Sequence, residues 1–167
     1  MNRDEIVAAL TELGRRLDRS GVTGEMYVVG GAAMALAYGT ARTTRDIDAV
    51  FEPKSVIYTV ADEMATELSL PAGWLNDAVK GFLVEDRGAV PVLEVPGLRC
   101  LVASPRILLG LKVLAHRAGE DEDDLRVLAG VLGLRDAASV LAIAEESFGD
   151  RLDAAARFFV EQTFASD

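Results

Sequence analysis

The stretch YVVGGAAMALAYGTARTTRDIDAVF, residues 27–51, constrains the fold more than any other part of the chain. Its pattern predicts an apolar strand, a glycine turn, a short helix of small residues, a basic loop and a second strand. Because side chains alternate along a strand, Asp46 and Asp48 share one face while Ile47 points to the other. The sequence therefore predicts two neighbouring carboxylates on a strand that follows a glycine turn and a helix.

This combination of residues favours a site for a metal ion and a phosphate. Two adjacent carboxylates repel each other unless a cation lies between them, and hard divalent ions prefer oxygen ligands. The glycine pair Gly30-Gly31, just ahead of a helix, lets backbone N–H groups approach a phosphate closely. Two simpler interpretations stay open. Asp46 and Asp48 could lie on a strand edge that only faces solvent, and the two glycines could serve only the conformation of the turn.

The rest of the chain predicts an α+β fold, a small mixed sheet with helices packed on it followed by a C-terminal helical bundle. Residues 1–103 would form the α/β core and residues 104–167 a helical region packed on it as one compact unit. Residues 74–77 are expected to form a short turn or helix. The remaining predicted elements are helices at 4–19, 55–68, 104–118, 121–132, 136–148 and 151–163, and strands at 81–85, 90–95 and 98–103.

Composition narrows the class of protein. The chain has 17 Lys and Arg against 27 Asp and Glu, a net charge of −10, which argues against a large nucleic-acid footprint, and no DNA partner is expected. No apolar run approaches the roughly 18 residues that span a bilayer, and the first residues lack a signal-peptide pattern, so we expect a cytoplasmic protein without a membrane partner. Cys100 and His116 are the only residues of their types, so zinc sites built from His and Cys are excluded.

Two segments resemble known nucleotidyltransferases. The order Gly30-Gly31, short helix, Asp46-x-Asp48 resembles the signature of the polymerase-β-like nucleotidyltransferase superfamily. The segment LLGLKVLAHRAGEDEDDLRVL, residues 108–128, resembles the later signature of the AbiEii-like branch, which includes toxins of bacterial toxin–antitoxin pairs. The chain is also similar, over roughly residues 26–134, to small bacterial nucleotidyltransferase-fold proteins of unassigned substrate.

The resemblance implies a nucleotidyltransferase-like fold and specific roles at the first segment. Asp46 and Asp48 would hold Mg²⁺ or Mn²⁺ for catalysis, and Gly30 and Gly31 would lie against the triphosphate of an NTP. The superfamily uses a third carboxylate on a neighbouring strand, and Glu94 is the candidate here. A glutamate exposed at the end of a strand is the alternative for Glu94.

Further nucleotide-binding residues are expected from the loop and from the later signature. Arg42 and Thr44 lie in the loop that leads to Asp46, with an ordinary solvated loop as the alternative. By resemblance, Lys112 would contact phosphate, and a lysine whose ammonium snorkels outward to solvent is the alternative. Asp124 would pair with Arg117 or Lys112 and so hold that lysine in place, with a purely structural aspartate near a helix start as the alternative. Asp121 is expected to be structural, at a helix start. Outside the site, Cys100 and Trp74 are predicted to lie in the core.

Three functions follow as hypotheses. The first is metal-dependent transfer of a nucleotidyl group from an NTP to a hydroxyl of RNA, a protein or a small molecule such as an antibiotic. In the RNA or protein case, the protein would be a toxin with a cognate antitoxin as partner. The second is a nucleotide-binding or interaction module of the same fold without turnover. The third is a helix-rich interaction protein in which the two aspartates are incidental.

Overall fold

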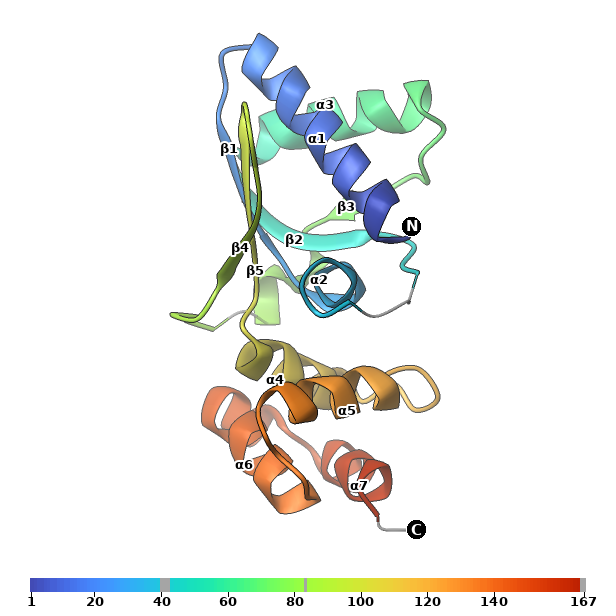
Figure 1. The fold of residues 1–167 in the computed structure, drawn as a ribbon, viewed down its shortest axis with the longest axis vertical. Helices are drawn as coiled ribbons and strands as arrows, with labels where there is room; N and C mark the ends of the chain where they lie inside the picture. Colours follow the sequence, from blue (N-terminus) through green and yellow to red (C-terminus); the bar gives the residue numbers. More distant parts are fainter. Residues whose placement is uncertain (40–42, 83, 166–167) are drawn as a thin grey trace. The chain divides into compact units, whose positions relative to one another are not determined.

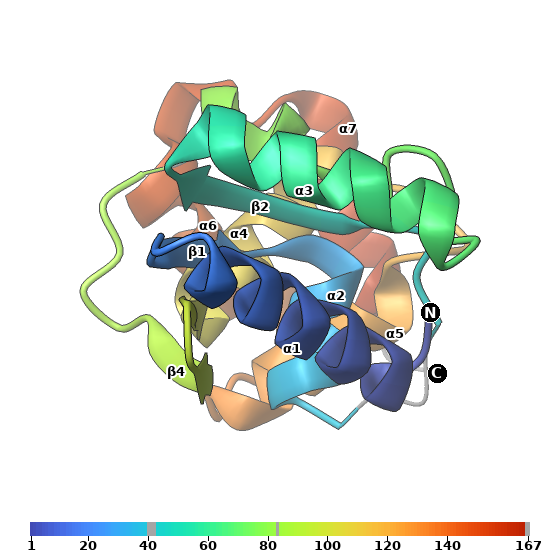
Figure 2. The same ribbon diagram turned by 90° about the horizontal axis from the view of Figure 1, so that it is seen from above.

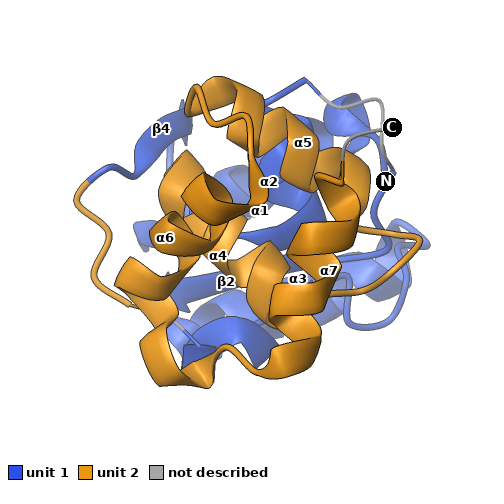
Figure 3. Ribbon diagram, turned by 90° about the horizontal axis from the view of Figure 1, so that it is seen from below, with its two compact units in different colours: residues 1–83, 88–103 blue, residues 84–87, 104–167 orange. Residues whose placement is uncertain are grey.

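The computed structural model describes residues 1–39, 43–82 and 84–165. The chain divides into two compact units, Met1–Leu83 with Gly88–Ala103, and Val84–Arg87 with Ser104–Asp167 (Figure 3). The described residues form a five-stranded mixed sheet and a run of C-terminal helices, which confirms the α+β fold class and is consistent with a nucleotidyltransferase-like fold. No described helix combines the length and the hydrophobicity needed to cross a membrane.

The first unit is built on the sheet, whose strands lie in the order β3-β2-β1-β5-β4. Strand β1 pairs antiparallel with β2 and parallel with β5, while β3 runs parallel to β2 and β4 antiparallel to β5. The strands are β1 (Gly24–Val28), β2 (Ile47–Glu52), β3 (Leu75–Asn76), β4 (Val90–Val95) and β5 (Leu98–Val102). The helices are α1 (Arg3–Arg19), α2 (Gly30–Ala37), α3 (Lys54–Glu67) and the 3₁₀ turn η1 (Ala78–Phe82).

Helices α1 and α3 cover one face of this sheet, and α2 packs against α1 and β2 (Figures 1 and 2). Helix α1 begins with a capping box between Asn2 and Glu5, and its apolar residues face inward at helical spacing. The strands alternate, so every second residue joins this core while the others point to the opposite face. Asp48 belongs to the opposite, more exposed face.

The second unit consists of helices whose starts are set by polar caps. The side chains of Ser104, Asp136 and Asp153 each accept a hydrogen bond from a backbone N–H three residues on. Gly110 of α4 lets Phe148 of α6 approach its backbone, because a Cβ there would lie 2.4 Å from the Phe148 ring. The helices are α4 (Pro105–Ala115), α5 (Glu122–Val131), α6 (Ala137–Phe148), η2 (Gly149–Arg151) and α7 (Ala154–Thr163).

Most predicted elements are confirmed to within a few residues, and three differ. The strand predicted at 81–85 is wrong for the residues that the structure describes there, 81–82 and 84–85, because the chain turns at η1, where the Asn76 side chain accepts the Ala78 N–H at 3.1 Å. Residues 74–77, predicted to form a turn or helix, instead include the short strand β3. The helix predicted to reach residue 118 ends at Ala115, because His116 adopts a left-handed conformation with φ of 37°.

Candidate active site

Asp48 lies near the start of β2, on its more exposed side, and Asp46 lies in the bend immediately before the strand. Ile47 between them is fully buried, while both aspartates are half-buried, as the predicted alternation requires. Backbone pairing continues past β1, since the Val29 N–H donates to the Asp48 carbonyl at 2.9 Å. The chain therefore enters the glycine turn directly beside Asp48.

The glycine turn packs against the residues of this site. Gly30 has a φ of +64°, and a Cβ on it would lie 3.0 Å from Oδ2 of Asp48. A Cβ on Gly31 would lie 3.1 Å from Oγ1 of Thr44. Both glycines begin α2, where the first N–H groups of a helix have no intrahelical acceptor. The turn thus brings helix N–H groups and a carboxylate together where β1 ends and β2 begins.

Thr44 supports the backbone of the site. Its hydroxyl donates to the Asp46 carbonyl at 2.9 Å, and its N–H donates to the Met1 carbonyl at 2.9 Å. This side chain therefore bonds the main chain of Asp46 rather than its carboxylate. Arg42, predicted to bind nucleotide from the same loop, lies outside the described residues.

Asn76 is a residue of this site whose role the sequence did not identify. It lies on β3 in register with Asp48, and its Nδ2 donates to Oδ2 of Asp46 at 3.2 Å. In the sequence, Asn76 was only one polar residue after Trp74, with no periodic pattern around it. Its role depends on the pairing of a two-residue strand.

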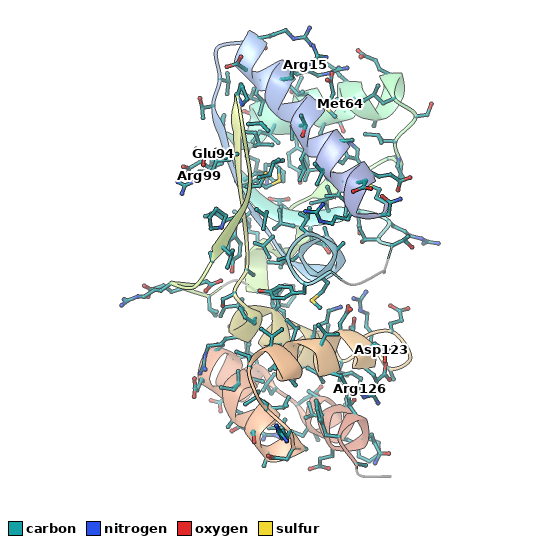
Figure 4. All side chains as sticks on the ribbon, in the orientation of Figure 1. Arg15, Met64, Glu94, Arg99, Asp123 and Arg126 are labelled. Carbon is teal, nitrogen blue, oxygen red and sulfur yellow. The ribbon has the colours of Figure 1, made fainter. Side chains whose placement is uncertain are left out.

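Glu94 is not brought to this site, which corrects its assignment as a catalytic residue. It lies on edge strand β4, beyond β1 and β5 from β2, and its register aligns it with Arg99, Glu25 and Glu52. Three strand spacings of ~4.8 Å and four residues of ~3.3 Å put it about 20 Å from Asp48 along the sheet. Figure 4 shows Glu94 beside Arg99 on the face away from α1. At that distance Glu94 cannot share a metal ion with the aspartates.

Lys112 lies in the second unit, inside a cluster of charged residues. Its Nζ lies 2.5 Å from Oδ1 of Asp121 and 2.7 Å from Oδ2 of Asp124, and the three side chains are 4%, 0% and 4% exposed. Arg117 also donates to Asp121, at 3.0 Å from Nε. Burial alone would raise the pKa of Asp121, but the hydrogen bonds from Lys112 and Arg117 outweigh it and hold the pKa below its ordinary value. The predicted phosphate ligand is thus engaged by two buried carboxylates of its own unit.

Two other side chains belong to the core, as predicted. Trp74 is buried, and its indole N–H donates to the Ala61 carbonyl at 3.0 Å. Cys100 is buried on β5, and burial raises the pKa of its thiol to about 12. A thiol with so high a pKa is a poor nucleophile at neutral pH.

The donor set at Asp46 and Asp48 fits a divalent metal bound together with a phosphate. Among the described residues, no group of three or more His, Cys, Asp or Glu could hold a metal ion, so the site offers two carboxylates. Mg²⁺ is commonly held by one or two carboxylates, with the remaining ligands from substrate phosphates and water. The helix N–H groups beside Asp48 suit such a phosphate.

Comparison with protein families supports a nucleotidyltransferase relationship. Residues 5–85 match the family model of a nucleotidyltransferase of unknown function, DUF6036. The matched segment holds the glycine turn, Asp46, Asp48 and Asn76, and it ends before Glu94 and Lys112. The match to this family model does not indicate the AbiEii-like branch. No curated protein matches the chain, and no solved structure does.

Proposed function

We propose that this protein is a metal-dependent nucleotidyltransferase that moves a nucleotidyl group from an NTP to a hydroxyl acceptor. The observation that carries the proposal is the close approach of the glycine turn to Asp48, 3.0 Å from the Cβ position of Gly30 to the carboxylate. This approach places a helix start, a position that favours anions, beside a pair of carboxylates, and the family match covers both segments. Mg²⁺ or Mn²⁺ is the expected metal.

Each part of the site has a distinct task in this proposal. Asp46 and Asp48 would hold the metal, which when bound neutralises phosphate charge and favours ionisation of an attacking hydroxyl. The first N–H groups of α2 would orient the phosphates. Thr44 and Asn76 would hold the main chain and the carboxylate of Asp46 in place. Lys112 is assigned no phosphate contact, because buried carboxylates surround its ammonium.

Transfer of label tests this proposal directly. The purified protein is incubated with each α-labelled NTP, Mg²⁺ or Mn²⁺, and bacterial RNA and protein extracts. We expect label in RNA, in a protein band or in a small molecule, and none with the double variant Asp46→Asn/Asp48→Asn. The matched control is Asp62→Asn, which neutralises an exposed carboxylate on α3 of the same unit. Equal labelling by the double variant and the control would overturn the role of the two aspartates.

The acceptor defines the biological role. Because residues 108–128 resemble AbiEii-like proteins, we propose a toxin as one biological role, with RNA or a protein as the acceptor. Induction in a bacterial host would arrest growth for the wild type but not for Asp46→Asn/Asp48→Asn. Labelling of an added small molecule without growth arrest would favour the small-molecule acceptor instead.

One observation favours a second candidate, a nucleotide-binding module without turnover. The strand next to β2 presents the amide of Asn76 to Asp46, where a third carboxylate would complete a catalytic set. Titration of NTP with and without Mg²⁺ separates the two candidates. Metal-dependent binding that is lost in the double variant, with no transfer to any fraction, would support the module.

A further inference from the structure

The contact between Asn76 and Asp46 has a defined direction. The Ala78 N–H is only a donor and lies 3.1 Å from Oδ1 of Asn76, so the oxygen of the amide must face it. The amide nitrogen is then left to face Oδ2 of Asp46, at 3.2 Å. One side chain is thus held at both ends, by a backbone N–H and by a carboxylate.

Strand β3, which carries Asn76, is anchored on both sides of this residue. Before it, the buried Trp74 donates its indole N–H to α3, and the Trp74 carbonyl accepts the Ile47 N–H at 2.6 Å. After it, Asp77 accepts from the Tyr58 hydroxyl at 2.7 Å and pairs with Lys54. A strand of two residues is too short to be rigid alone, and these anchors fix it against β2 and α3.

We propose that Asn76 is a positioning residue for the metal site and that its uncharged amide keeps the site at two carboxylates. This inference rests on the proposed function. A side chain that hydrogen-bonds a metal-binding carboxylate fixes its orientation, and loss of such a group commonly weakens metal binding 10- to 100-fold. A carboxylate at position 76 would instead lie against Oδ2 of Asp46 and add a negative ligand.

Binding of Mn²⁺ to the full chain, followed by the electron paramagnetic resonance signal of free Mn²⁺, tests the proposal without activity. For Asn76→Ala we expect about 10-fold or greater loss of affinity, because the Asp46 carboxylate loses its donor. For Asn76→Asp we expect affinity above the wild type, and a larger rise in melting temperature on adding Mn²⁺, because the metal relieves repulsion between two carboxylates.

Asp77→Asn is the matched control for strand stability. It weakens the pairing with Lys54, but an oxygen at position 77 can still accept from the Tyr58 hydroxyl, and the contacts of Trp74 still hold β3. It should therefore lower the melting temperature, with Mn²⁺ affinity within about threefold of wild type, below the 10-fold change expected when a side chain that hydrogen-bonds a metal ligand is lost. Asn76→Ala binding Mn²⁺ like the wild type would overturn the positioning role. Asn76→Asp with Mn²⁺ affinity equal to or below wild type would overturn the argument that the uncharged amide limits the site to two carboxylates. If Asn76→Ala does not fold, the Mn²⁺ affinity of Asn76→Asp alone tests the proposal.

The failure of the proposed function gives a different result. A folded wild type that binds no Mn²⁺, alone or with ATP, would remove the metal site itself and this inference with it. A wild type that binds Mn²⁺ tightly and an Asn76→Ala variant that does so equally would leave the metal site in place and remove only the role of Asn76.

Discussion

The molecule gathers aspartates in two places and treats them differently. In the second unit, Asp121 and Asp124 are buried around the ammonium of Lys112. In the first unit, Asp46 and Asp48 are half-buried, and Asp46 accepts a hydrogen bond from the neutral amide of Asn76. The carboxylates of the first cluster are buried, whereas those of the second are half-buried and reach solvent.

The difference separates a structural cluster from the proposed ligand site. Buried carboxylates are strongly destabilising unless a cation and hydrogen bonds compensate them. The folded state therefore requires Lys112 to compensate the charges of Asp121 and Asp124. Half-exposed carboxylates retain water and can exchange it for a metal ion. A site for a ligand must be reachable, and accessibility here favours Asp46 and Asp48 over the Lys112 cluster.

The largest expected effect comes from removing the internal cation. Lys112→Met leaves two buried carboxylates without their ammonium, and breaking a buried pair this way costs about 3–5 kcal/mol of unfolding free energy. Urea unfolding measures it, with Lys80→Met, an exposed lysine on η1, as the control expected to stay near wild type. If Lys112→Met kept its stability and lost only NTP binding, the lysine would be a phosphate ligand and the comparison would fail.

The second prediction concerns acid. The pKa of Asp121 is lowered in the folded state, so its stabilising contribution is fully present above the unfolded value of 3.8 and is lost as the pH falls through the folded value. Urea midpoints of the wild type should therefore drop as the pH is lowered below about 4. In Lys112→Met a principal cause of the lowered pKa is gone, so the loss with acid should be smaller. Equal slopes for both proteins would contradict the role assigned to the ion cluster.

A smaller effect is expected at the glycine turn. Gly30→Ala places a methyl group 3.0 Å from the Asp48 carboxylate in a left-handed conformation, which costs about 1–2 kcal/mol and displaces the carboxylate that we propose as a metal ligand. Gly21→Ala is the matched control, because Gly21 has a similar φ of +68° with no atom within 4 Å of its Cβ position. Gly30→Ala should lose at least as much stability in urea as Gly21→Ala, because it adds the contact with Asp48 to the cost of the backbone conformation, and only Gly30→Ala should lose Mn²⁺ affinity. Parallel losses of affinity would mean that the close approach to Asp48 has no role in the site.

Local signals in the sequence predicted the parts of the fold that local physics determines. Periodic leucines and polar caps define α1 and α4, and alternation around Ile47 defines the face that carries Asp46 and Asp48. The glycine turn was recognisable because its residues are adjacent in sequence to the strand and helix that they join.

The parts that were missed depend on partners distant in sequence. Asn76 reaches Asp46 only because β3 pairs with β2, and the anchors of β3 come from α3. The pairing of Lys112 with Asp124 was expected by resemblance, but the contact of Lys112 with Asp121 was not, because it requires the turn between α4 and α5. Strand order cannot be deduced from a strand's own residues, which is why Glu94 was assigned to the wrong neighbourhood.

The smallest expected effect tests that reassignment. Glu94→Gln removes a carboxylate on the far edge strand, opposite Arg99, and should leave Mn²⁺ affinity and label transfer within about twofold of wild type, because about 20 Å separates Glu94 from Asp48 along the sheet. Asp48→Asn, assayed in parallel, should lose both. A loss of transfer in Glu94→Gln with Mn²⁺ affinity retained would indicate that the face carrying Glu94 and Arg99 contacts the acceptor. A loss of Mn²⁺ affinity would instead mean that the sheet order assigned to the first unit is wrong, since no other route brings this carboxylate to the metal.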